Sequence, residues 1–280
     1  MKNIILAILV TVFAFAKANS QNIQGVATYK TQRHVDFKMD STSGMGDEMQ
    51  KMLQEQLRKQ FQKEFKLTFN SAEAIWKEDV SLDKPQGPSS SGVQIVMSGM
   101  GGDDYALYQN VAEQKYTEQN DLMGKQFLVQ DILEKPEWKL EKETKNIGQY
   151  TCYKATLTEE IEERSFSSIN GEGEEEVKKV TKVTTAWYTL DIPVQHGPED
   201  FWGLPGLILE VNDGKMAMMC TQVVINPKDG ISIEIPTKGK KVNEKEFEKI
   251  SEEKSKEMME RYNGGGRKGD HNSFEIRIGG

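Results

Sequence analysis

Alternation of apolar and polar residues runs through most of this chain and predicts β-strands. It is clearest at residues 23–39, where Ala27 and Tyr29 share one face, and it returns at Phe65, Leu67 and Phe69. The face then shifts after Asn70, as a bulge or turn requires. Further strand candidates, joined by short turns, are residues 72–76, 93–98, 104–111, 114–118, 125–133, 138–145, 150–160, 177–190, 207–212, 216–225 and 231–235.

Two segments show helical spacing instead. Residues 47–64 carry a stripe with Met49, Leu53 and Leu57, and a second helix is predicted over residues 244–261. The second begins with a capping-box pattern and has a thin apolar stripe. We therefore expect a mainly β (α+β) protein with a single large curved antiparallel sheet or half-barrel. The helix at about 47–64 should lie over the sheet, and the helix at about 244–261 should lie on the surface.

The N-terminus resembles a secretory signal peptide over residues 1–20, with Lys2 followed by a short apolar run and small residues before Gln21. No later apolar run approaches the length of a transmembrane helix. We expect export to the periplasm or the extracellular space, and no transmembrane span. The mature chain should comprise a β-rich domain over residues 21–236, then a C-terminal helix and a flexible basic glycine-rich tail over residues 237–280.

Two short segments of the mature chain need separate predictions. The acidic residues 172–176 are expected to form a solvated loop between two strands. Residues 274–278 alternate again at the end of the tail, so they either add an edge strand or remain disordered.

Net charge argues against one class of function, and the cysteine content predicts a structural feature. The formal charge is −8 and the isoelectric point about 5.2, which argues against binding nucleic acid through its phosphates. The two cysteines, Cys152 and Cys220, are an even number in an exported chain, so we expect one disulfide between them. The alternative is two buried free thiols.

The most distinctive segment is residues 186–211, AWYTLDIPVQHGPEDFWGLPGLILEV. It combines a strand, a long loop with two adjacent aromatics and a second strand that is apolar at every position. In Leu204-Pro205-Gly206-Leu207, proline fixes φ and glycine accepts a positive φ, which predicts a type II turn. The segment therefore predicts a hairpin whose loop is closed by a rigid turn.

The pattern AWYT-DIP-GP-F-GLPGLILEV resembles the signature of the GLPGLI family of secreted proteins, found mainly in Bacteroidetes. The upstream GQYTCYKA at residues 148–155 is similar to the family's preceding strand, and the resemblance covers most of residues 23–227. The family has no agreed activity. The resemblance thus implies secretion and a β-rich build, and it implies no catalytic residues.

Few side chains suggest catalysis. Among three histidines only His196 lies in the distinctive loop, near Glu199 and Asp200, and three such residues on one loop are common by chance. No serine-hydrolase, zinc-protease or CxxC motif occurs. We expect no catalytic residue, no metal and no cofactor, and we take Phe201, Trp202, His196 and Trp187 as candidates for contact with a ligand or partner. Phe201 and Trp202 could instead cap the core.

Three functions follow, in order of support. The first is a non-enzymatic binding protein that carries an apolar or lipid-like ligand, by analogy of element order with periplasmic lipoprotein-carrier half-barrels. The second is a cell-envelope interaction protein that docks on an outer-membrane partner through Phe201 and Trp202. The third is a hydrolase with an unrecognised site.

Overall fold

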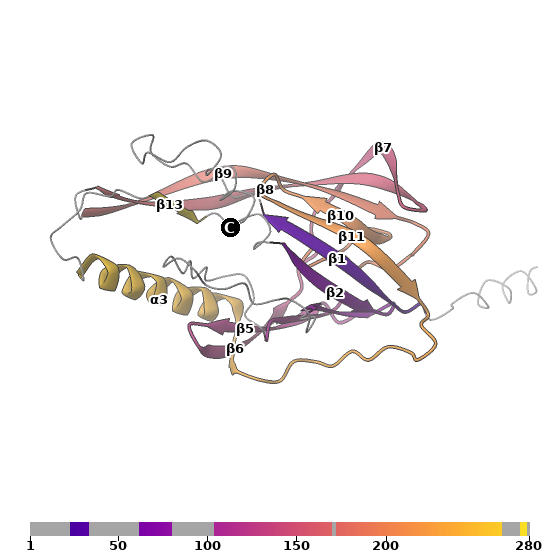
Figure 1. Cartoon of the computed structure of the whole chain (residues 1–280), viewed down its shortest axis with the longest axis horizontal. Coiled ribbons are helices and arrows are strands. Elements are labelled where there is room, and N and C mark those ends of the chain that lie inside the picture. Colours follow the sequence, from indigo (N-terminus) through magenta and orange to yellow (C-terminus); the bar gives the residue numbers. More distant parts are fainter. Residues whose placement is uncertain (1–22, 34–61, 80–103, 170–171, 265–274, 279–280) are drawn as a thin grey trace, which may run out of the picture.

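The structure is a computed structural model that describes residues 23–33, 62–79, 104–169, 172–264 and 275–278. These residues form one 13-stranded sheet and a helix near the C-terminus (Figure 1). The elements are β1 (Gly25–Arg33), β2 (Lys63–Phe69), β3 (Glu73–Glu78), β4 (Ala106–Asn110), β5 (Lys115–Leu122), β6 (Lys125–Ile132), β7 (Lys139–Ile147), β8 (Tyr150–Ile169), β9 (Glu172–Thr189), β10 (Leu207–Asn212), β11 (Met216–Ile225), β12 (Lys240–Val242), α3 (Glu244–Gly264) and β13 (Glu275–Ile278).

The sheet is open and is not closed into a barrel. Its strand order is β12-β6-β5-β4-β3-β2-β1-β11-β10-β9-β8-β13, and β7 pairs only with β8. All pairings are antiparallel except that of β12 with β6. The predicted mainly β class with one large sheet is confirmed. The predicted helix at 47–64 lies almost wholly outside the described residues, and its last two positions, 63 and 64, belong to β2.

The core follows the alternation in the sequence. Ala27 and Tyr29 are fully buried, and Leu67 and Phe69 from the neighbouring β2 pack with them. The Tyr29 hydroxyl donates to the carbonyl of Ile208 at 2.7 Å, which ties β1 to β10 across the core. A buried phenol needs such a partner, since an unpaired hydroxyl is costly.

A long hairpin of β8 and β9 leaves the body of the sheet (Figure 1). Its strands pair without a break from Cys152 opposite Thr189 to Ile169 opposite Glu172. The prediction of an acidic loop at residues 172–176 is therefore wrong. Residues 172–176 are polar or glycine at every position, so no apolar alternation marks this part of β9. Opposite charges such as Glu159 and Lys182 face each other elsewhere in the hairpin. Residues 275–278 form the edge strand β13 on β8.

The C-terminal helix α3 is confirmed and runs three residues beyond its predicted end. Asn243 and Glu246 form the predicted capping box: the Asn243 side chain accepts from the Glu246 N–H at 2.9 Å, and the Glu246 carboxylate accepts from the Asn243 N–H at 3.1 Å. Phe247 packs edge-on against Phe127 of β6. The strand predicted at residues 231–235 is not formed, and the short parallel β12 joins β6 instead.

The predicted disulfide is not formed. Cys152 and Cys220 are both free thiols, on β8 and β11, with β9 and β10 between them in the sheet. Neighbouring strands lie about 4.8 Å apart, so three steps span roughly 14 Å along the sheet. A disulfide needs Cα atoms about 4.4–6.8 Å apart. Cys152 is instead a buried small apolar residue of the core.

The segment expected to be a signal peptide, residues 1–20, lies outside the described residues. Within the described part of the chain, no helix is both long and apolar enough to cross a membrane.

Candidate functional site: the signature loop and its pocket

We call residues 190–206, between β9 and β10, the signature loop. Its own backbone holds it in place. The Leu207 N–H donates to the carbonyl of Ile192 at 2.9 Å, Ile208 to His196 at 3.0 Å, and Gly203 to Gln195 at 3.1 Å. These bonds cross the loop from end to end, so it is a fixed part of the fold.

The two glycines of GLPG, Gly203 and Gly206, are required for different structural reasons. The predicted type II turn is wrong, because Gly206 does not have a positive φ and the Leu207 N–H bonds to Ile192 rather than to Leu204. A β-carbon on Gly206 would lie 1.9 Å from the carbonyl oxygen of Thr189, so this glycine permits close approach of two backbones. Gly203 has the positive φ, of 90°.

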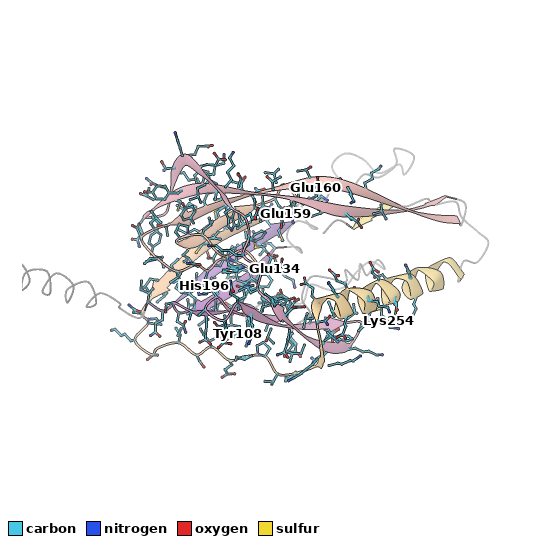
Figure 2. The ribbon with its side chains drawn as sticks, turned by 180° about the vertical axis from the view of Figure 1, so that it is seen from behind. Tyr108, Glu134, Glu159, Glu160, His196 and Lys254 are labelled. Atoms are coloured by element: carbon cyan, nitrogen blue, oxygen red, sulfur yellow. The ribbon has the colours of Figure 1, made fainter. Side chains whose placement is uncertain are left out.

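His196 is an anchor inside the protein. It is fully buried, and Figure 2 shows it within the body of the sheet. Its Nε2 donates to the carbonyl of Asn70 at 3.0 Å, which joins the signature loop to the turn between β2 and β3. Burial lowers the pKa of His196 to about 4, so the ring is neutral at pH 7. Its Nδ1 is buried without a partner.

His196 is electrostatically separate from Glu199 and Asp200, its neighbours in the loop. Burial lowers the pKa of His196 and the bond to Asn70 raises it, whereas the charge of Asp200 raises the pKa of Glu118 of β5. Burial raises the pKa of Glu118, and the charges of Asp200 and Glu244 raise it further. Asp200 is exposed as a residue, but the protein around its carboxyl raises its pKa as well. Within the described ranges, no three His, Cys, Asp or Glu side chains form a group that could hold a metal.

Phe201 and Trp202 lie in the core side of the loop, with 8% and 3% of their surface exposed. The Trp202 indole N–H donates to the carbonyl of Glu134 at 3.2 Å, and the Trp138 indole N–H donates to the carbonyl of Trp202 at 2.8 Å. Trp138 also packs against Phe201. This placement corresponds to the core-cap alternative, and the contact role of the two residues stays a prediction.

Trp187, the remaining contact candidate, lies on β9 away from the loop. The Lys145 ammonium stands 4.4 Å from the centre of its ring and bonds to the Glu210 carboxylate at 2.6 Å. A cation already covers the ring, so Trp187 has a structural partner within the chain.

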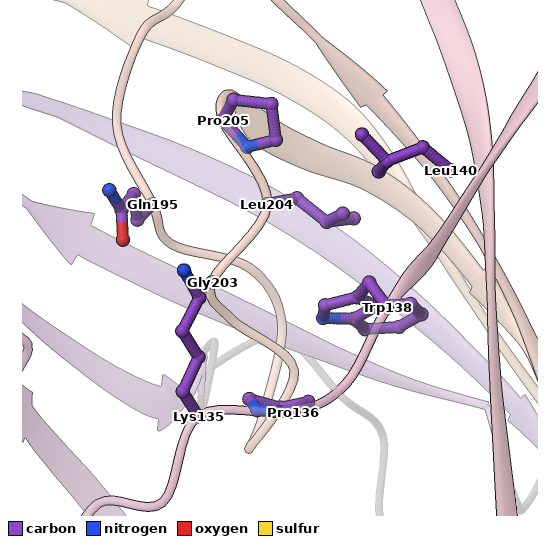
Figure 3. A pocket seen from close by; sticks show the side chains of 8 residues that line it. All are labelled: Lys135, Pro136, Trp138, Leu140, Gln195, Gly203, Leu204 and Pro205. Atoms are coloured by element: carbon purple, nitrogen blue, oxygen red, sulfur yellow. The ribbon is translucent and has the colours of Figure 1, made fainter.

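A pocket of about 270 Å³ opens beside the signature loop, where the segment before β7 meets GLPG (Figure 3). Trp138, Leu140 and Pro205 supply exposed apolar surface, and Leu140 is 57% exposed. Leu204 also lines the pocket, but its side chain is almost fully buried. Lys135 and Gln195 supply polar groups at the other side (Figure 3). Pro136 and Gly203 complete the lining. Of the predicted site residues, Leu204 and Pro205 of the turn thus line this pocket, while Phe201 and Trp202 support it from behind through Trp138. His196 contacts Asn70 and Phe69 instead.

The sequence did not point to Lys135, Pro136, Trp138, Leu140 or Gln195. Their contribution depends on a contact between segments about 65 residues apart, namely the tryptophan hydrogen bonds just described. The local sequence offers only Pro136 and Trp138 just before a strand. This pair does not indicate a binding site unless the contact with the signature loop is known.

A family model described as a protein of unknown function (Porph_ging) matches residues 138–210. The matched region thus begins at Trp138 of the pocket and ends within β10. No curated protein matches this chain.

Two crystal structures of PNGF-II resemble the fold distantly. The form in space group C2 is 14% identical with a TM-score of 0.45, over 81% of this chain and 32% of that chain. The form in space group P21 is 15% identical with a TM-score of 0.45, over 82% of this chain and 33% of that chain. This chain therefore spans about a third of the length of PNGF-II.

Proposed function

We propose that this chain is an exported, non-enzymatic binding protein that holds one apolar group of its ligand or partner in the pocket beside the signature loop. The observation that carries the proposal is the pocket wall. Trp138 and Leu140 remain partly exposed, and they are fixed opposite Leu204 and Pro205 by hydrogen bonds from two tryptophans. Rigid apolar surface of this kind lowers the entropic cost of binding.

The size of the pocket indicates what fits. Ligand-binding clefts usually enclose about 300–1,000 Å³, so this pocket of about 270 Å³ takes a single small apolar group. That volume favours an interaction protein or a small-ligand binder over the predicted carrier of a whole lipid. The carrier hypothesis stays a prediction, and ligand-bound mass spectrometry of protein from its native source tests it.

A catalytic role draws little support from the loop. His196, the best candidate for acid–base chemistry in the sequence, is enclosed, neutral and bonded to Asn70. A general base must reach the proton that it removes, and a fully buried ring cannot do so.

We further propose membership of the GLPGLI family and export. The segment AWYT to LILEV supports this proposal, and most of it lies within residues 138–210, the part of this chain that the family model of unknown function matches. The first 20 residues support export. N-terminal sequencing of the protein from its native source should begin near Gln21, and retention of residues 1–16 would contradict export.

The binding proposal is tested with a neutral probe, N-acetyl-leucinamide, titrated into the full mature chain while tryptophan fluorescence is recorded. We expect saturable binding in the millimolar range, since so few atoms give only a few kcal/mol. Leu140→Glu should abolish it. Val183→Glu is the matched control, because Val183 is similarly exposed, at 51%, on β9 outside the pocket. Equal binding by both variants would place the probe elsewhere and overturn the proposal.

A further inference from the structure

We propose that the pocket selects an apolar carboxylate, with the carboxylate bound by Lys135 and the apolar part packed on Trp138, Leu140 and Pro205. The proposal rests on the function proposed above and adds the chemical class of the ligand. That class covers both the last residue of a protein chain and a small branched acid.

The two walls of the pocket differ in chemistry. Figure 3 shows the apolar side chains of Trp138, Leu140 and Leu204 on one side and Lys135 with Gln195 on the other. A ligand that fills the pocket must therefore be apolar at one end and polar at the other.

Lys135 is held at the pocket by its aliphatic stem. Its Cγ and Cε lie 3.4 and 3.5 Å from the position that a β-carbon on Gly203 would occupy, so the stem packs over this glycine. A β-carbon at position 203 would only touch the lysine stem at ordinary van der Waals distance, so the φ of 90° is what favours glycine there. The lysine stem thus lies against the backbone of the signature glycine.

The charge of Lys135 is not neutralised within the described part of the chain, where it forms no salt bridge. Nearby lysines differ in this respect: Lys139 pairs with Glu141 at 2.9 Å, and Lys145 pairs with Glu210 at 2.6 Å. Glu134 and Glu137 flank Lys135 in sequence, yet neither forms an ion pair with it. An ammonium with no ion-pair partner among the described residues is a suitable site for an anion from outside, even in a chain of net charge −8.

The hydrogen-bond donors that remain free at the pocket further restrict which polar group of a ligand can bind. The indole N–H groups of Trp138 and Trp202 already donate to backbone carbonyls, so neither is left for a ligand. Lys135 and the Gln195 amide remain as donors on the polar side of the pocket, and a carboxylate can accept hydrogen bonds from both types of group.

The test compares four probes on the full mature chain at low salt. N-acetyl-leucine carries both groups, N-acetyl-leucinamide lacks the charge, N-acetylglycine lacks the apolar group, and 4-methylpentanoate is a small acid without a peptide bond. We expect N-acetyl-leucine to bind at least tenfold more tightly than its amide and than N-acetylglycine. Added salt should reduce this preference, because it screens an exposed ion pair.

Lys135→Gln should remove the preference for the acid while leaving amide binding unchanged. Lys125→Gln is the matched control, an exposed lysine at the start of β6 outside the pocket. Comparable affinity for 4-methylpentanoate would identify a small acid as the ligand, whereas tighter binding of N-acetyl-leucine would identify a chain terminus. Either result supports the proposal.

Three results would overturn the inference. Equal affinity for N-acetyl-leucine and its amide would show that the negative charge of the ligand does not contribute to binding, and the proposed function would stand. Persistence of the preference in Lys135→Gln would place the anion elsewhere. Binding of N-acetylglycine as tight as that of N-acetyl-leucine would show that only the attraction between the carboxylate and a positive charge holds the ligand, with no contribution from its apolar group. If instead no probe bound at all, the proposed function itself would fail.

Discussion

Gly206 and the carbonyl of Thr189 lie so close that a β-carbon on the glycine would stand 1.9 Å from the oxygen. Thr189 is the last residue of β9 and faces Leu207, the first residue of β10, in the ladder. The contact therefore closes the signature loop at its base. Close approach of two backbone segments, rather than a positive φ, explains why Gly206, the second glycine of GLPG, is a glycine.

Gly206→Ala should destabilise the fold by about 1–3 kcal/mol or more, since the new methyl group must displace backbone. Gly214→Ala is a useful comparison, because Gly214 has a φ of 88° but nothing within 4 Å of its β-carbon position. It should lose about 1–2 kcal/mol from φ strain alone. Chemical denaturation measures both. A Gly206→Ala protein as stable as wild type would refute the close approach.

Trp202→Ala should cost about 3–5 kcal/mol of unfolding free energy, because the ring is buried and its N–H holds the segment before β7. Leu140→Ala is the control on the exposed wall of the pocket, and it should change stability by less than about 1 kcal/mol. If Trp202→Ala left the melting temperature unchanged but abolished ligand binding, Trp202 would be a contact residue rather than a core cap.

His196 should make the protein less stable as the pH falls from about 6.5 to about 4. In this window the unfolded chain binds a proton at His196, whereas the folded pKa of about 4 keeps the buried ring neutral. The loss amounts to about 3 kcal/mol for a shift of this size. Below pH 4 both states are protonated and the contribution ends.

The variant His196→Gln isolates this effect, because an amide can still donate to the Asn70 carbonyl but does not titrate. Between pH 7 and pH 4 the unfolding free energy of the wild type should fall by about 3 kcal/mol more than that of the variant. Parallel curves over that range would show that His196 is not buried as described.

Glu118→Gln should stabilise the protein at neutral pH and above. Burial and the charges of Asp200 and Glu244 raise the folded pKa of Glu118 above its unfolded value, so ionisation costs stability as the pH rises through that pKa. The amide removes this cost and keeps an oxygen that can accept from Asn120. The gain should vanish below about pH 4.5. Glu160→Gln, at an exposed position of β8, is the matched control for the chemical change itself.

Sequence reasoning succeeded where a strand has one buried and one exposed face. The alternation at Ala27 and Tyr29, and at Leu67 and Phe69, follows directly from the two-residue repeat of a strand. It failed at residues 172–176, where both faces are polar, and at β12, whose three residues are too short for a pattern.

The candidate site was predicted in part. The signature loop could be located because its composition is unusual, and Leu204 and Pro205 do line the pocket. The local pattern of Pro205 and Gly206 suggested a turn, but the hydrogen bond from Leu207 to Ile192 shows that distant backbone decides the conformation. The opposite wall, with Trp138 and Leu140, comes from a remote segment that no local pattern links to the loop.

The central claim is that the pocket beside the signature loop binds an apolar group. The most direct test is a two-dimensional amide NMR titration of the full mature chain with N-acetyl-leucinamide. We expect saturable shifts of the Trp138 indole N–H and of the backbone amides of Leu140, Gly203 and Leu204, with the Val183 amide unmoved. Saturable shifts confined to other regions, or none at these positions at saturating probe, would contradict the account.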